Sequence, residues 1–161
     1  MFGNLNIIKL LNQKPQAHAK INGSNTYQKI SGNVYFYGTR SGVIVLSIIS
    51  GLPKGKDACQ SPIFAFHIHE GESCSGNQKD PFMDAMTHYN PKKCVHPYHA
   101  GDMPPLFSAD GTAFSAFLTN RFLIKEIIGK TVIIHSLPDD FTTQPSGNSG
   151  TKIACGVINA I

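Results

Sequence analysis

The sequence predicts an all-β fold, a Greek-key β-sandwich or barrel of about eight antiparallel strands with two long functional loops. Three observations favour this class. The 161 residues include 15 Gly and 10 Pro, which suit many turns and would weaken a helical bundle. Short apolar segments recur between turn signals, and no long segment has a helical period. With 41% apolar and 15% charged residues, the chain can bury a core of its own.

The first part of the chain contains three predicted strands joined by turns. In the second of these strands, Val34 and Phe36 lie two residues apart and therefore share one face. The third strand is almost wholly apolar, which suits the core of a sandwich. Gly, Ser, Asn and Pro mark the turns between them. These predicted strands are 17–21, 30–37 and 43–49.

The second part alternates predicted strands with long irregular segments. Residues 70–105 and 138–151 are rich in turn-forming residues and are predicted to be the two long loops. Loops of such length in a compact domain are usually functional or disordered, and we expect these two to be functional. One helical turn is expected at 124–128. The predicted strands of this part are 63–68, 113–118, 131–135 and 153–158.

We expect one domain, residues 17–161, after a loosely packed N-terminal leader, residues 1–16. The leader has no basic segment before an apolar core and no small-residue cleavage site, so a cytoplasmic location is expected. No apolar stretch reaches about 18 residues, so no membrane partner is expected. The 14 Lys and Arg are scattered and the net charge is only +4, so nucleic acid is not expected either.

The histidines indicate metal chemistry. Six of the seven lie between His67 and His135, and such clustering is unusual for core histidines. His67 and His69 share one face of a predicted strand, and His135 ends another strand that could lie beside it. A second set has spacings of eight, three and three and could surround one tetrahedral ion; imidazole suits zinc and copper. This second set is His88, His96, His99 and Asp102.

The chain resembles the copper/zinc superoxide dismutase family. Five segments that carry the resemblance occur in the family's order, and weaker similarity extends from about Ala17 to the C-terminus. The segments are FHIHE at 66–70, THYNP at 87–91, HAGD at 99–102, TVIIH at 131–135 and GNSGTKIACGVI at 147–158.

The resemblance implies a role for each candidate site residue. His88 would bridge a copper ion and a zinc ion, and Asp139 would accept hydrogen bonds from His67 and His96 behind the metals. The implied copper ligands are His67, His69, His88 and His135, and the implied zinc ligands are His88, His96, His99 and Asp102.

The cysteines alone leave the disulfide pairing open, because Cys59, Cys74, Cys94 and Cys155 allow three arrangements. The resemblance implies a bridge between Cys74 and Cys155. Cys59 and Cys94 are additional to the family's usual pair, and a second bridge between them is a prediction.

Two further departures from the family pattern concern the site. Only two residues separate His96 from His99, where better-known members have a longer zinc segment. Lys152 occupies the position of the family's active-site arginine, so the positive charge is kept without the planar pair of donors. The two implied catalytic residues are His88 and Lys152.

The function that the resemblance implies is conversion of superoxide to oxygen and hydrogen peroxide. Copper would change oxidation state and zinc would be structural. A homodimer is the expected assembly. The alternative is a protein of the same fold that binds copper and zinc without turnover.

Overall fold

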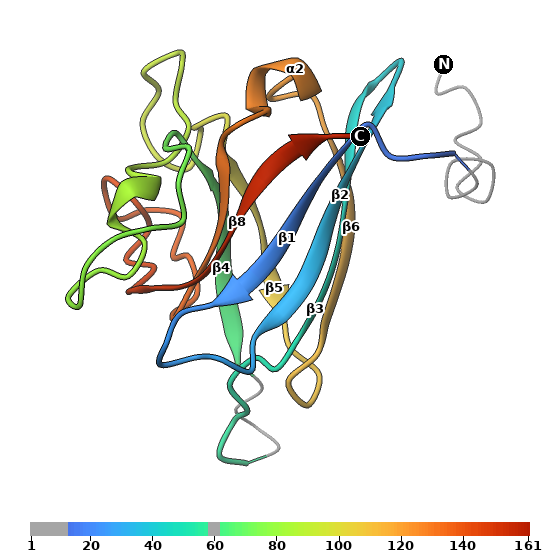
Figure 1. The fold of residues 1–161 in the computed structure, drawn as a ribbon. Coiled ribbons are helices and arrows are strands. Elements are labelled where there is room, and N and C mark those ends of the chain that lie inside the picture. Colours follow the sequence, from blue (N-terminus) through green and yellow to red (C-terminus); the bar gives the residue numbers. More distant parts are fainter. Residues whose placement is uncertain (1–12, 58–61) are drawn as a thin grey trace.

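The fold is known from a computed structural model that describes residues 13–57 and 62–161. In these residues the regular structure consists of eight strands, one short α-helix and one turn of 3-10 helix (Figure 1). The strands are β1 (Ala17–Gly23), β2 (Ser31–Thr39), β3 (Gly42–Ser50), β4 (Ile63–His69), β5 (Asp102–Phe107), β6 (Ala113–Thr119), β7 (Thr131–His135) and β8 (Lys152–Ala160). The helices are η1 (Met83–Ala85) and α2 (Ile124–Ile127).

The eight strands form one antiparallel sheet that curls into a nearly closed barrel. Their order is β5-β4-β7-β8-β1-β2-β3-β6, and the two end strands, β5 and β6, contact each other across the remaining gap. The connections β3–β4 and β6–β7 cross from one part of the barrel to another, as in a Greek key. The predicted fold class is therefore confirmed.

The core follows from the alternation of side chains along each strand. Val34 and Phe36 of β2 point into the barrel and are fully buried. β4 differs, because both of its faces are buried. Phe64, Phe66 and Ile68 belong to the main core, whereas His67 and His69 lie on the opposite face.

The two long loops cover that second face of β4. They follow β4 and β7 and lie on the same side of the barrel, in green to yellow and in orange to red in Figure 1. The second loop contacts the first through both backbone and side-chain hydrogen bonds. The candidate site therefore lies between the barrel wall and the two loops.

One strand was not predicted. β5 begins inside the segment 70–105, which the sequence marks as irregular. Pro104 and Pro105 explain the error, because proline cannot donate to a ladder and argues against a central strand. The structure tolerates them because β5 is an end strand and its pairing with β4 is irregular between Phe64 and Phe66.

The helical content is as small as predicted. α2 falls within the predicted turn at 124–128. In the part of the chain that the structure describes, no helix has the length and apolar character needed to cross a membrane.

Candidate metal centre

Four histidines from three parts of the chain form the first group of possible metal ligands, called here the copper group. β4 supplies two of them, the end of β7 supplies one, and the loop after β4 supplies the last. Each offers a ring nitrogen, and these nitrogens all lie within 4.8 Å of one another. The copper group is His67, His69, His88 and His135, all buried.

The second group, called here the zinc group, lies on the segment 88–102, called here the zinc loop. Its carboxylate is central: Asp102 Oδ1 lies 2.8 Å from His88 Nδ1, and Oδ2 lies 3.1 Å from His96 Nδ1 and 3.4 Å from His99 Nδ1. Three imidazoles and one carboxylate around a small volume suit tetrahedral zinc. The zinc group is His88, His96, His99 and Asp102, all buried.

His88 belongs to both groups and faces them with opposite ring nitrogens. Its Nδ1 lies in the zinc group beside Asp102. Its Nε2 is buried on the other side and has no hydrogen-bond partner among the described residues. The centroid of its ring lies 4.0 Å from that of His67 of the copper group, with the two ring planes tilted by 39°. A single side chain therefore joins the two groups.

Hydrogen bonds fix which nitrogen of the copper-group rings is free. His67 Nε2 donates to Asp139 at 2.8 Å, which leaves the buried Nδ1 without a partner. His69 Nδ1 donates to the Met86 carbonyl oxygen at 2.9 Å, which leaves Nε2 facing His135 Nε2 at 3.2 Å. Buried polar atoms are normally satisfied, so the unpartnered ring nitrogens His67 Nδ1 and His88 Nε2 fit a metal ion.

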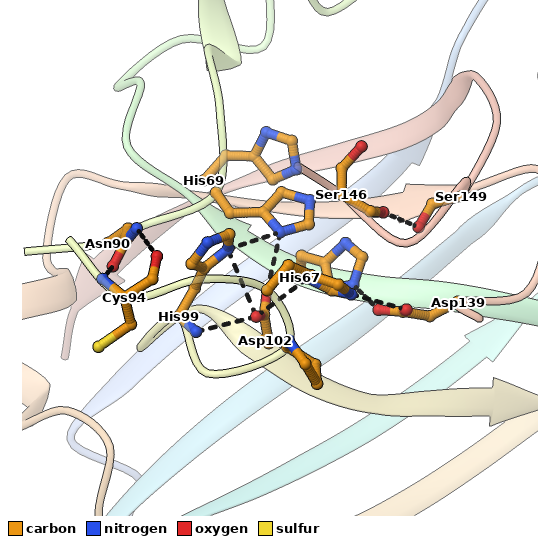
Figure 2. A network of polar contacts seen from close by, with 12 residues as sticks. His67, His69, Asn90, Cys94, His99, Asp102, Asp139, Ser146 and Ser149 are labelled. Carbon is orange, nitrogen blue, oxygen red and sulfur yellow. Dashed lines mark hydrogen bonds and ion pairs between the residues drawn. The ribbon is translucent and has the colours of Figure 1, made fainter. Parts of the chain in front are cut away.

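Asp139 connects the two groups from behind. Its two carboxylate oxygens accept hydrogen bonds from His67 Nε2 at 2.8 Å and from His96 Nε2 at 2.9 Å (Figure 2). The backbone amide of Phe141, two residues further along the chain, donates a third hydrogen bond to Asp139 Oδ1 at 2.7 Å. A carboxylate in this place orients both rings and raises their basicity toward a metal.

Burial and these bonds set the ionisation of the site. Burial lowers the pKa of His67 to about 4 and the pKa values of His69 and His135 well below the ordinary range. The rings are therefore neutral at pH 7, the form that binds metals. Burial alone would raise the pKa of Asp139, but the hydrogen bond from His67 and the other donors hold it well below its ordinary value.

Gly147 has no side chain, and this leaves room for the hydrogen bond between Asp139 and His96. A Cβ atom at this position would collide with the Asp139 carboxylate and would lie 2.7 Å from His96 Nε2. The residue also has φ of +68°, which favours glycine. The glycine at the start of the motif 147–158 thus has a steric role at the site.

A pocket of about 760 Å³ opens onto the copper group. It is lined by His69, His88 and His135, and also by the charged residues Lys79, Lys93, Glu70 and Asp80. The lysine ammonium groups favour entry of a small anion, whereas the two carboxylates oppose it.

Lys152, which also lines this pocket, is held in place rather than extended into solvent. It begins β8 beside His135. Its Nζ donates to Asp80 Oδ2 at 2.6 Å and to the Phe82 carbonyl oxygen at 3.0 Å. Sequence reasoning missed Asp80, because no spacing or motif marks a partner 72 residues from Lys152.

The disulfide bond between Cys74 and Cys155 is present and confirms that pairing. It joins the loop after β4 to β8, with a Cα–Cα distance of 5.7 Å. Cys94 forms no disulfide with any described residue, and Cys59 lies outside the described residues, so the second bridge stays a prediction. Asn90 closes the turn that contains Cys94 through two hydrogen bonds with its backbone (Figure 2).

Comparison with known proteins identifies the family to which these two groups of metal ligands belong. The family model described as copper/zinc superoxide dismutase matches residues 30–158, which include both groups, Asp139 and Lys152. The chain belongs to the copper/zinc superoxide dismutase family. It is 36% identical over 163 residues to superoxide dismutase [Cu-Zn] 2 of Aquifex aeolicus, covering 91% of this chain and 88% of the relative.

Two other members of the family are similar over different lengths. The Deinococcus radiodurans enzyme is 31% identical over 151 residues, covering 83% of this chain and 79% of the relative. The Photobacterium leiognathi enzyme is 37% identical over 107 residues, covering 58% and 62%. Copper and zinc are the metals of this family, and the two groups of this chain have suitable ligands for both.

Proposed function

We propose that this protein is a superoxide dismutase that converts two superoxide ions and two protons into oxygen and hydrogen peroxide. Family membership supports the reaction. The observation that carries the proposal is the position of His88, whose two ring nitrogens face two different groups of metal ligands beside an open pocket.

The donor sets favour a different metal in each group. The all-imidazole set of His67, His69, His88 and His135 would hold copper. The set of three imidazoles and a carboxylate, His88, His96, His99 and Asp102, would hold zinc. When bound, copper supplies the one-electron chemistry, and zinc, which has no redox chemistry, stabilises the loop and the orientation of His88.

The chain's own residues supply protons, orientation and charge. His88 Nε2 is the atom at which we expect a proton to be held for the peroxide product, since it is buried and has no hydrogen-bond partner among the described residues. Asp139 keeps His67 and His96 in the correct tautomers. Lys152 adds a positive group to the pocket through which the anion arrives.

Metal analysis combined with an activity assay tests the proposal. The purified protein, reconstituted with both metals, is expected to hold one copper and one zinc and to remove superoxide at a rate proportional to its copper content. His88→Ala is expected to lose turnover. A protein that binds both metals in the expected amounts without turnover would instead be the non-catalytic metal-binding protein.

The assembly and the location are proposed separately. We propose a homodimer and a cytoplasmic location, neither of which the catalytic proposal requires. Sedimentation velocity of the metal-loaded protein and fractionation of the source cells test them. A monomer at micromolar concentration, or recovery outside the cytoplasm, would refute the respective expectation.

A further inference from the structure

Three backbone carbonyl oxygens of the zinc loop converge on one guanidinium nitrogen. Arg121 lies between β6 and α2, and its Nη1 is 2.9 Å from the Pro97 oxygen. The same atom is 3.2 Å from the His99 oxygen and 3.2 Å from the Asp102 oxygen. Carbonyl dipoles that point at one place repel one another unless a donor or cation lies between them, so the Arg121 charge stabilises this convergence.

The loop 136–151 also holds the zinc loop, through hydrogen bonds made by the side chain of Gln144. Gln144 Oε1 accepts a hydrogen bond from the His96 amide at 3.0 Å, and Gln144 Nε2 donates to the His96 carbonyl oxygen at 2.7 Å. One side-chain amide therefore satisfies both backbone groups of a zinc-group residue. Since Asp139 binds the ring of His96, the loop 136–151 fixes this residue through both its backbone and its ring.

The turn between His96 and His99 makes few backbone bonds of its own. Tyr98 donates to the Val95 oxygen at 2.8 Å, and Asp102 donates to the His99 oxygen at 3.3 Å. Only two residues separate the two imidazoles, so a small change in the turn would move both ring nitrogens. The His99 amide also donates to Asp102 Oδ2 at 3.0 Å, and the contacts from Arg121 and Gln144 add to these few bonds in holding the turn in one shape.

We propose that Arg121 and Gln144 are positioning residues that set the zinc affinity of this loop by holding its backbone. The inference rests on the proposed zinc site and extends it to two residues that touch no ring nitrogen of the zinc group. Groups that orient metal ligands from behind commonly change metal affinity about 10- to 100-fold when removed. Both residues act on the backbone that carries His96, His99 and Asp102.

The test compares zinc binding in matched variants of the whole chain. Arg121→Gln removes the charge and most donors, whereas Arg121→Lys keeps an ammonium. Gln144→Glu keeps the acceptor for the His96 amide but turns a carboxylate oxygen toward the His96 carbonyl. Arg40→Gln is the control, because Arg40 is the other arginine of the sequence and is exposed at the β2–β3 turn.

Zinc affinity is measured by competition with a chelator, and the ligand geometry by the visible absorption of cobalt(II) bound in place of zinc. We expect Arg121→Gln and Gln144→Glu to bind zinc about tenfold or more weakly and to alter the cobalt bands. Arg121→Lys should recover part of the loss, and Arg40→Gln should match the wild type. Melting of each metal-free variant separates weaker zinc binding from loss of the fold.

Several results would overturn the inference. Wild-type zinc affinity and cobalt bands in Arg121→Gln would do so, and so would an Arg121→Lys variant as weak as Arg121→Gln. If Arg121→Gln does not fold, unchanged zinc binding in Arg121→Lys and Gln144→Glu together would overturn it. Retention of zinc by a His99→Ala, Asp102→Ala double variant would instead refute the proposed zinc site itself.

Discussion

The ammonium of Lys152 is 2.6 Å from the carboxylate of Asp80, on the wall of the pocket that leads to the copper group. The charge of Lys152, which is expected to stand at the position of the family's arginine, is therefore partly neutralised by a neighbour. The lysine side chain is 14% exposed and the aspartate side chain 38%, so solvent screens the pair only in part. We therefore expect anion attraction at this site to depend on both residues.

Charge removal at Asp80 is expected to speed the reaction. Asp80→Asn keeps an acceptor for Lys152 but removes a negative charge, so superoxide should enter a few-fold faster at low ionic strength. Lys152→Ala should slow the reaction and Lys152→Glu should slow it further, while Lys152→Arg should hold or raise the rate.

The dismutation rate against ionic strength, at matched copper content, measures these effects. Added salt should slow the wild type and shrink the differences among variants, because the Debye length is about 10 Å at 0.1 M salt. If Lys152→Glu reacted as fast as the wild type at low salt, Lys152 would have no role in attracting the anion.

The two metal groups should separate by mutation although they share His88. His135→Ala removes a ligand of the copper group only, so turnover should disappear while zinc stays bound. Asp102→Ala should release zinc first and destabilise the zinc loop, because the carboxylate contacts all three imidazoles of its group. Metal content by mass spectrometry is the measurement. Equal loss of both metals from each variant would contradict two distinct sites.

Asp139 and Asp140 provide a matched pair of adjacent carboxylates. Asp139→Asn places an NH₂ group against two donating rings, so one of His67 and His96 loses its acceptor. Metal affinity or activity should fall about 10- to 100-fold. Asp140 is exposed and bonds to Thr142 and Thr143, so Asp140→Asn should be close to wild type in copper and zinc binding. Similar losses in both variants would argue against a special role for Asp139.

A methyl group at Gly147 should weaken metal binding by a steric clash, in addition to the backbone strain that it causes. Gly147→Ala would collide with the Asp139 carboxylate and His96. Gly129→Ala is the control, since Gly129 also has positive φ, at +85°, but its Cβ would meet nothing closer than 3.9 Å. Each variant should lose about 1–2 kcal/mol through the left-handed backbone. Only Gly147→Ala should also weaken zinc and copper binding, as measured by chelator competition.

The disulfide should contribute substantially to stability. It closes a loop with a sequence separation of 81 residues. In the chain-entropy account such a loop contributes about 4 kcal/mol. Replacing Cys74 and Cys155 together by serine should lower the free energy of unfolding by an amount of this order, measured with denaturant on metal-free protein. Cys94→Ser serves as the comparison, and an equal loss there would show that the effect is not specific to the bridge.

The parts that the sequence predicted are those with a local pattern. Alternating apolar residues such as Val34 and Phe36 predicted strands that the structure contains. All histidines of the two metal groups except His96 stood in recognisable motifs, and His67 and His69 did lie on one face of a strand.

The parts that could not be predicted depend on contacts between loops. Asp80, Arg121 and Gln144 are single polar residues in irregular segments, and nothing in their neighbours marks them. Their partners lie 72 residues away for Asp80 and 48 residues away for Gln144. Such contacts form only when the folded barrel brings the loops together, so no spacing or periodicity in the sequence predicts them.

The two prolines of β5 have a consequence for encounters between copies of the chain. β5 is an end strand of the sheet, and an end strand with free N–H groups can pair with a strand of another molecule. Pro104 and Pro105 have no backbone N–H groups to donate, and the irregular pairing with β4 falls at the same place. A strand of another molecule should therefore pair poorly with the edge of β5. This should protect newly made, metal-free chains from aggregation through strand pairing.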